Sequence, residues 1–182
     1  MDRKEFFKKA CGYGTCTCVG LMLSPGALLS ATTPDEKKED WRIGFIQERM
    51  ATLIESANNE LDQKKLISLL EHMGRQCAQS NRQKAEQYKG NLNGYLKNIA
   101  PYVDKAEHDE AKGTIKIVGV VNNSCFCPFV DTSKMPEEFC NCTKGWQKET
   151  YETIIGKPVE VKIDESVLRG SNRCVFTISY FV

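Results

Sequence analysis

Apolar side chains in the first half of the chain recur at helical spacing. Over residues 40–58 they form one stripe, which predicts an amphipathic helix. Asp62 is placed to cap a second helix, whose apolar stripe runs as far as Cys77. A third helical pattern covers residues 90–111 and is interrupted by Pro101. The first half of the chain is therefore predicted to be helical.

After Gly113 the spacing changes to the alternation typical of strands. A helix is predicted between Pro136 and Gly156, because a proline favours its first turn and a glycine its end. Strands are predicted at residues 114–121, 124–129, 159–163 and 173–181. Helices first and strands afterwards predict an α+β fold, in which N-terminal helices pack on a four-stranded antiparallel sheet.

The first 31 residues have a composition of their own. A charged opening precedes a weakly apolar run, and small residues follow at Ser30 and Ala31, an order typical of an export signal. The opening resembles the twin-arginine export motif, with a lysine as its second basic residue. The residues that carry this likeness are Arg3, Lys4, Phe6, Phe7 and Lys8.

This pattern predicts an export signal over residues 1–31, a linker over 32–39 and a single α+β domain over 40–182. The protein would then be exported, to the periplasm or the extracellular space. An uncleaved anchor and a segment that belongs to the fold are the alternatives. Pro25 and Gly26 interrupt the apolar run, so we expect no membrane span in the mature chain.

Charge excludes one class of partner. Lys and Arg together number 25 and Asp and Glu 24, so the 182-residue chain has no field that would attract nucleic acid. We therefore expect no nucleic-acid partner. The apolar fraction of 41% is that of an ordinary globular domain with its own core. The oligomeric state is left open.

The chemistry of the chain is concentrated in its cysteines. Cys125 and Cys127 form one C-x-C pair, and Cys140 and Cys142 form a second. On a strand, two residues of such a pair share a face and are roughly 6.6 Å apart, so both thiols of the first pair can reach one ion. Inside a helix they are about 200° apart around the axis. The second pair can therefore chelate only at a helix entrance or a turn.

Four thiolates favour zinc in a tetrahedral site, and the predicted ligands are Cys125, Cys127, Cys140 and Cys142. An iron–sulfur cluster is the alternative cofactor. Disulfides stay open, because an exported protein with an even number of cysteines meets an oxidising compartment. Free thiols stay open as well. Cys77 and Cys174 follow the spacing of their own elements, so we expect them to line the core or a pocket.

Several short motifs of the last third carry a family resemblance. They are Phe139-Cys140-Asn141-Cys142, Ile154-Ile155-Gly156-Lys157-Pro158, Ser166-Val167-Leu168-Arg169-Gly170 and Cys174-Val175-Phe176. Residues 113–182 resemble the 4-vinyl-reductase-like small-ligand-binding domain and the L-2-amino-thiazoline-4-carboxylic acid hydrolase-like group. The resemblance implies a pocket between helices and sheet, with a small-molecule ligand and with Cys140 and Cys174 near it.

Two functions follow from these patterns. The first is an exported, cysteine-rich, metal-binding domain with a small-ligand pocket. The second, implied by the hydrolase-like group, is hydrolysis of a cyclic C–N bond by a metal-bound water or a cysteine thiolate. His72 and His108 have no evident catalytic partner in the sequence, and no phosphate-binding or dinucleotide motif is present. Whether the protein is an enzyme is left open.

Overall fold

The computed structural model describes residues 40–122 and 124–181, which belong to one compact unit. The predicted export signal and linker, with the motif residues Arg3, Lys4, Phe6, Phe7 and Lys8, lie outside the described residues. Among the described helices, none combines the length and the apolar character that crossing a membrane requires.

Two long helices open the described chain, as the apolar stripes predict. Helix α2 (Trp41–Glu60) begins after Asp40, whose carboxylate accepts a hydrogen bond from the Arg42 backbone N–H. Helix α3 (Gln63–Gln79) begins after Asp62, which caps the Lys65 N–H at 3.0 Å. Both caps satisfy donors that the first helical turn leaves free.

The predicted helix over residues 90–111 is wrong beyond its first half. After α4 (Arg82–Glu86), helix α5 spans only Leu92–Ile99, and a short 3-10 turn, η1 (Ala100–Tyr102), leads into strand β1 (Val103–Asp109). Pro101 has no backbone N–H and clashes with the preceding turn, so the α-helix ends just before it. The apolar residues beyond it belong to a strand.

The described strands form one antiparallel sheet in the order β1-β2-β4-β3. The remaining strands are β2 (Thr114–Gly119), β3 (Val159–Glu165) and β4 (Val175–Tyr180). The predicted strand at 124–129 is wrong, since β1 already occupies the edge beside β2. Residues 124–129 form no ladder; the Val130 N–H instead closes a turn on the Cys127 carbonyl. The predicted fold class, α+β with a four-stranded antiparallel sheet and helices, is confirmed.

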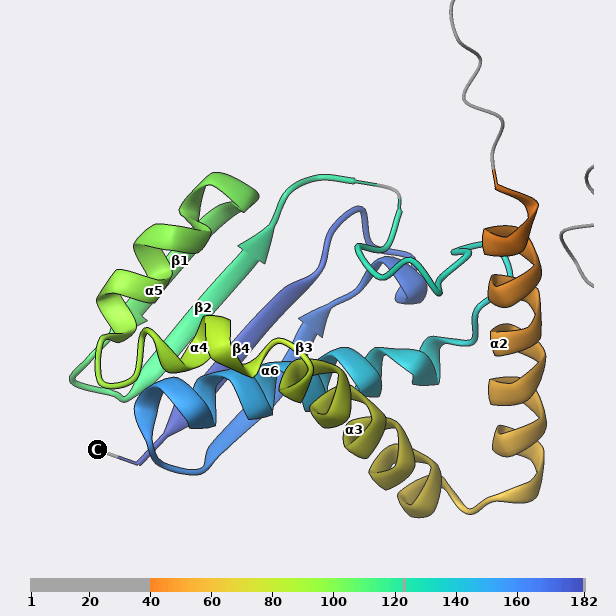
Figure 1. Cartoon of the computed structure of the whole chain (residues 1–182), viewed down its shortest axis with the longest axis horizontal. Coiled ribbons are helices and arrows are strands. Elements are labelled where there is room, and N and C mark those ends of the chain that lie inside the picture. Colours follow the sequence, from red (N-terminus) through yellow and green to blue (C-terminus); the bar gives the residue numbers. More distant parts are fainter. Residues whose placement is uncertain (1–39, 123, 182) are drawn as a thin grey trace, which may run out of the picture. The chain divides into compact units, whose positions relative to one another are not determined.

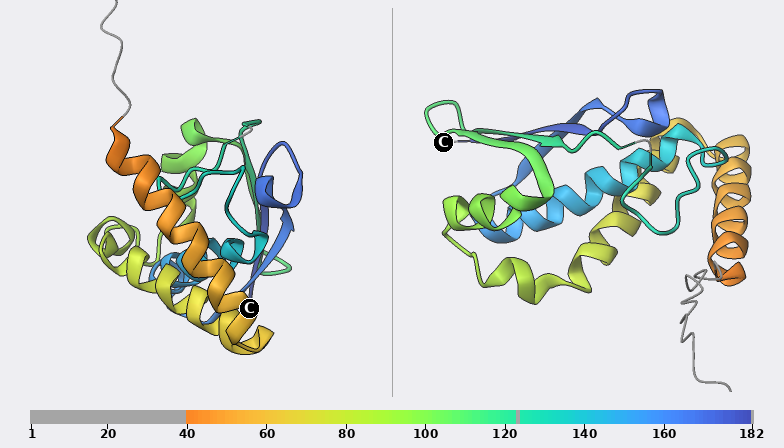
Figure 2. Two further views of the ribbon diagram at one scale, coloured as in Figure 1. Left: turned by 90° about the vertical axis from the view of Figure 1, so that its right-hand side faces the viewer. Right: turned by 90° about the horizontal axis from the view of Figure 1, so that it is seen from above.

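The helices cover one face of the sheet (Figure 2). Helix α6 (Cys140–Ile155) follows the 3-10 turn η2 (Glu137–Phe139) and packs on β3. It ends at Gly156, whose φ of 76° is readily adopted only by glycine. Side chains of α4, α5, α6 and the sheet form the main core, which includes Ile115, Tyr151 and Ile178. The other face of the sheet carries polar side chains.

A second hydrophobic cluster lies among α2, α3 and the segment after β2. It contains Ile54, Leu66, Leu70, Met135 and Phe139, with three of the cysteines packed against it. Figure 1 shows α2 at the far edge of the domain, beyond α3 and the start of α6. The cysteines therefore lie where the main core and this second cluster meet.

Candidate functional site

The position of Cys140 and Cys142 is set by where helix α6 begins. Cys140 is its first residue, so both cysteines have helical backbone and point about 200° apart around the axis. Cys140 is buried beside Ser166, whereas Cys142 packs against the cluster formed by α2 and α3. The sequence predicted that this pair could chelate one ion only at a helix entrance or a turn. Because Cys140 and Cys142 both lie in the first turn of α6, their thiols point in different directions and do not face one centre.

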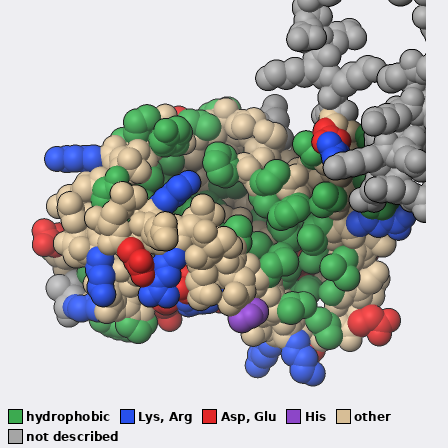
Figure 3. All heavy atoms as spheres, in the orientation of Figure 1, with side chains coloured by type: hydrophobic (Ala, Val, Ile, Leu, Met, Phe, Trp, Pro, Cys, Tyr) green, Lys and Arg blue, Asp and Glu red, His purple; other side chains and the backbone are tan. Residues whose placement is uncertain are grey.

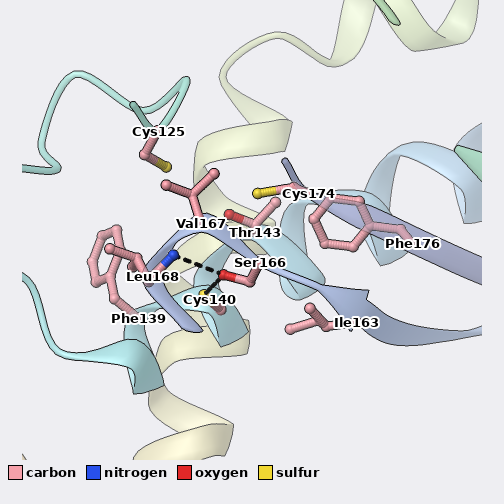
Figure 4. A pocket seen from close by; sticks show the side chains of 10 residues that line it. All are labelled: Cys125, Phe139, Cys140, Thr143, Ile163, Ser166, Val167, Leu168, Cys174 and Phe176. Atoms are coloured by element: carbon pink, nitrogen blue, oxygen red, sulfur yellow. Dashed lines mark hydrogen bonds between the residues drawn. The ribbon is translucent and has the colours of Figure 1, made fainter. Parts of the chain in front are cut away.

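A small pocket lies on the Cys140 side of α6 (Figure 4). Its volume is about 20 Å³, which is room for roughly one water molecule. The lining is mostly apolar, with three thiols and two hydroxyl groups. The lining residues are Cys125, Phe139, Cys140, Thr143, Ile163, Ser166, Val167, Leu168, Cys174 and Phe176.

Ser166 organises the floor of this pocket. Its Oγ lies 2.9 Å from the Sγ of Cys140 in a buried hydrogen bond, and it accepts a second bond from the Leu168 N–H at 3.1 Å. The second bond caps the short helix η3 (Val167–Arg169). Ser166 is only 2% exposed, so the hydroxyl has little access to water. It therefore fixes Cys140 and the turn that carries Val167 and Leu168.

Three thiols reach the pocket from three different segments, and we call Cys125, Cys140 and Cys174 the pocket thiols. Figure 4 shows the sulfur atoms of Cys125 and Cys174 on opposite sides of Val167. Burial raises the pKa of Cys140, and the nearby Cys174 and Cys125 raise it further against the opposing effects of Ser166 and Arg169. Burial also raises the pKa of Cys125. Cys140 and Cys125 are therefore protonated, poor nucleophiles at neutral pH.

A second group lies on the other side of α6, and we call Cys77, Cys127 and Cys142 the helix-side thiols. Burial raises the pKa of Cys142 to about 12, and Cys127, Cys77 and Cys125 contribute to the shift. Burial likewise raises the pKa of Cys127, with further contributions from Cys125 and Cys77. Cys127 and Cys142 pack against the second hydrophobic cluster, and Cys125 packs against the same cluster.

The second C-x-C pair is thus divided, with Cys140 at the pocket and Cys142 on the helix side. In the first pair, Cys125 lines the pocket and also packs, with Cys127, against the second hydrophobic cluster. Cys174 lines the pocket; Cys77 is exposed on α3 and is not among the lining residues. All six cysteines of the described part are free thiols. Among residues 40–122 and 124–181, no three His, Cys, Asp or Glu side chains already stand in a metal-holding arrangement.

Neither histidine accompanies the thiols. His72 is exposed on α3, and His108 on β1 shares a 2.7 Å hydrogen bond with the Tyr180 hydroxyl. The lining of the described pocket includes no histidine and no carboxylate. Ser166 and Thr143 are the polar lining residues that sequence reasoning missed. A serine just before a short apolar run and a glycine is a capping signal that identifies Ser166.

The chain matches one protein-family model. Residues 32–181 match the family of unknown function DUF6144. The chain belongs to this family. No curated protein matches the DUF6144 chain.

Solved structures of similar fold come from distant proteins. The phenol-responsive sensory domain of the transcription activator PoxR, with phenol, is 14% identical at a TM-score of 0.51 and covers 73% of each chain. Trafficking protein particle complex subunit 3 from Naegleria fowleri, covalently bound to palmitic acid, is 13% identical at a TM-score of 0.53, covering 78% of this chain and 96% of that one. At these identities the likeness shows a shared fold.

A vinyl-4-reductase family protein from Methanocaldococcus jannaschii is also among the similar structures. It is 16% identical and covers 78% of this chain and 96% of that one, at a TM-score of 0.36. The resemblance to 4-vinyl-reductase-like domains thus has a counterpart among solved structures, although at this TM-score it supports no argument. The resemblance to the thiazoline-carboxylate hydrolase-like group stays a prediction.

Proposed function

We propose that this domain binds one zinc ion through the thiolates of Cys77, Cys125, Cys127 and Cys142, beside a pocket for a small molecule. The observation that supports the proposal is that Cys125, Cys127 and Cys142 pack against the same hydrophobic cluster, while Gly74 brings the helix of Cys77 against Cys142. In the described part of the chain no three of them stand in a metal-holding arrangement, so zinc would have to draw the side chains together. Cys142 is influenced by all three of the others, and Cys127 by Cys125 and Cys77. A bound cation would relieve the repulsion that deprotonation of so many neighbouring thiols creates.

This ligand set differs by one residue from the set that the spacing predicts. It contains Cys77 in place of Cys140, because α6 directs Cys140 towards Ser166 and away from Cys142. Gly74 lets α3 approach α6 so closely that an added methyl group would overlap the Cys142 carbonyl, which brings Cys77 of α3 near the site. Four thiolates form a closed tetrahedral site, which suits a structural rather than a catalytic zinc. The same thiolates are the ligands of the alternative cofactor, an iron–sulfur cluster.

Metal analysis of single-cysteine variants tests the proposal. We expect about one zinc per chain in protein purified without chelator under reducing conditions, measured by mass spectrometry of the metal. Cys77→Ser and Cys142→Ser should lose the zinc, and the matched controls Cys140→Ser and Cys174→Ser should retain it. Loss with Cys140→Ser but not with Cys77→Ser would restore the ligand set predicted from spacing. Bound iron with visible absorption would favour the iron–sulfur cluster. Metal-free protein with all thiols reactive would contradict both the zinc site and the cluster.

The pocket supports the second half of the proposal. Its lining is apolar apart from thiols and the hydroxyls of Thr143 and Ser166, which suits a small apolar molecule with one hydrogen-bonding group. A volume of about 20 Å³ admits no such ligand, so binding requires a wall to move. The phenol of the PoxR domain and the palmitic acid of the trafficking subunit are the probes that the shared fold suggests.

A thermal-shift titration with phenol and with palmitate tests ligand binding. A ligand that binds the folded state raises the melting temperature, and the rise grows with the logarithm of the ligand concentration above its Kd. We expect one of the two probes to raise it, and Thr143→Ile, which adds one carbon to the lining and replaces the hydroxyl, to reduce the rise without lowering the zinc content. No shift with either probe at millimolar concentration would argue against an apolar ligand site.

Two further proposals concern the location of the protein and a catalytic activity. An exported location follows from residues 1–31 alone, and zinc on the thiols would protect them from oxidation in such a compartment. Cell fractionation with a C-terminal tag would test it. The alternative function, hydrolysis of a cyclic C–N bond, has less support, because the described pocket places no base beside Cys140 or Cys174. Zinc with an open coordination position would favour it.

A further inference from the structure

Helix α2 leaves most of its apolar surface in contact with solvent. Of its 20 residues, only Ala51 and Ile54 are buried. The large apolar side chains left exposed on it are Trp41 at 74%, Ile43 at 48%, Phe45 at 49%, Ile46 at 45% and Leu53 at 60%. A helix with so many exposed large apolar residues is incompletely packed by its own domain.

Part of this surface forms an ordered stripe. Ile46, Met50, Leu53 and Ala57 follow one another at intervals of four, three and four residues, the spacing of a coiled-coil seam. Met50 and Ala57 are half-buried at the edge of the second hydrophobic cluster, so the stripe continues from the core onto the surface. Figure 3 shows hydrophobic side chains gathered in a continuous area on the side of the domain where α2 lies.

We propose that α2 packs antiparallel against α2 of a second copy of this chain, around a twofold axis between Ala51 and Thr52. This axis places Ile46 against the partner's Ala57 and Met50 against the partner's Leu53. The contact is isologous, because the same stripe serves both copies. The proposal does not depend on zinc or on the pocket, since the stripe contains none of the cysteines.

Charge supports the antiparallel orientation. Arg42 and Glu60 lie at opposite ends of α2, 18 residues apart and therefore at the same angle around its axis. Both are exposed beside the stripe, and Arg42 also pairs with Asp40 of its own chain at 2.8 Å. The twofold axis brings Arg42 opposite the partner's Glu60 at each end of the contact, whereas a parallel pair would set like charges together. The opposed helix dipoles also favour this direction.

Not every exposed apolar residue of α2 belongs to this contact. Trp41 and Phe45 lie more than about 100° around the helix axis from the stripe, so the contact itself rests on Ile46 and Leu53 together with Met50 and Ala57. An anionic membrane is a poorer occupant for the same surface. The helix has two basic residues, Arg42 and Arg49, against three acidic ones, Glu48, Glu55 and Glu60, whereas membrane-surface helices are rich in Lys and Arg.

Sedimentation equilibrium of the full chain tests the proposal. We expect twice the chain mass of 20.5 kDa at micromolar concentration. Leu53→Glu should weaken the dimer at least about tenfold, because it buries a charge in the centre of the seam. The matched control, Thr52→Glu, adds the same charge at the next exposed residue outside the stripe and should leave the dimer intact. Circular dichroism checks that both variants fold.

A charge exchange tests the orientation. Glu60→Arg alone should weaken the dimer by opposing Arg42 of the partner, and adding Arg42→Glu should restore it. A monomer at all concentrations, or a dimer that Leu53→Glu leaves unchanged, would overturn the proposal. Recovery of the monomer on phosphatidylglycerol vesicles would assign the surface to a membrane instead. Neither result would affect the zinc content, so failure here is distinct from failure of the proposed function.

Discussion

Gly74 of α3 and Gly145 of α6 lie at the crossing of the two helices, each against the backbone of the other. A methyl group on Gly74 would overlap the Cys142 carbonyl, and one on Gly145 would overlap the Glu71 carbonyl. This approach holds the start of α6 on α3 and brings the two helices that carry Cys77 and Cys142 together. The crossing therefore links the packing of the domain to the geometry of its thiols.

Alanine at either crossing glycine should destabilise the protein. We expect Gly74→Ala and Gly145→Ala each to lower the free energy of unfolding by about 1–3 kcal/mol, because the helices must move apart. Gly44 is the matched control, since nothing lies within 4 Å of a methyl group there. Gly44→Ala should be neutral or gain up to about 1 kcal/mol from helix propensity. Urea denaturation measures all three, and equal effects at Gly44 and Gly74 would contradict the close crossing.

Ion pairs beside the crossing predict a pH dependence. Arg75 of α3 donates to Glu149 at 2.9 Å and to Glu152 at 2.6 and 3.1 Å. Burial raises the pKa of Glu152, but hydrogen bonds and charge from Arg75 outweigh it and lower the pKa below its usual 4.5. A lowered folded-state pKa means that this stabilisation is present above pH 4.5 and is lost as the pH falls through the folded value.

Arg75→Met should therefore cost about 2 kcal/mol at pH 7, because two half-buried carboxylates lose their partner. The cost should be smaller at pH 3, because the stabilisation that Arg75 gives to Glu152 weakens as the pH falls towards the lowered pKa of that carboxyl. Arg82→Met removes an exposed pair with Glu86 and should change stability by no more than about 0.5 kcal/mol at either pH. Urea denaturation at the two pH values gives the comparison. If Arg75→Met lowers the free energy of unfolding equally at both pH values, the packing of Arg75 and not its charge accounts for the effect.

Apolar periodicity predicted the long elements because one face of each is buried against one of the two hydrophobic clusters. The stripes of α2 and α3, the Asp62 cap, and the alternation of β2, β3 and β4 all follow from local spacing. Strand β1 could not be recognised in this way. It lies at the edge of the sheet with most of its side chains exposed or half-buried, so its apolar residues are few and fit a helical period equally well.

The candidate site was harder to predict. The spacing of two cysteines says where their side chains point only once it is known whether they lie on a strand, in a helix or in an irregular segment. Cys125 and Cys127 were expected on a strand, but they lie in an irregular segment, and α6 starts at Cys140 itself. Cys77 is 48 residues from the nearest C-x-C pair, and it joins the others only through the crossing at Gly74. Tertiary packing of this kind leaves no local signal.

Ser166 should contribute to stability through its buried hydroxyl. Ser166→Ala removes the cap on the Leu168 N–H and the partner of Cys140, which should cost about 1–2 kcal/mol. It should also raise the pKa of Cys140, because the hydrogen bond from Ser166 now lowers it against the effect of burial. Ser133→Ala, at an exposed turn, is the control and should be close to neutral. Urea denaturation and the pH dependence of Cys140 alkylation measure the two effects.

Two of the helix-side thiols, Cys77 and Cys142, should differ in how fast they react. Cys77 is exposed, whereas Cys142 is half-buried with a pKa raised to about 12, so almost none of it is thiolate at pH 7.5. We expect iodoacetamide to alkylate Cys77 at least about tenfold faster than Cys142 in metal-free protein, followed by peptide mass mapping. Zinc should then slow the alkylation of Cys77 strongly and leave the alkylation of Cys174 unchanged, because Cys77 is a proposed zinc ligand and Cys174 is not. Equal protection of both would place the metal in the pocket, and no protection of either would remove Cys77 from the ligand set.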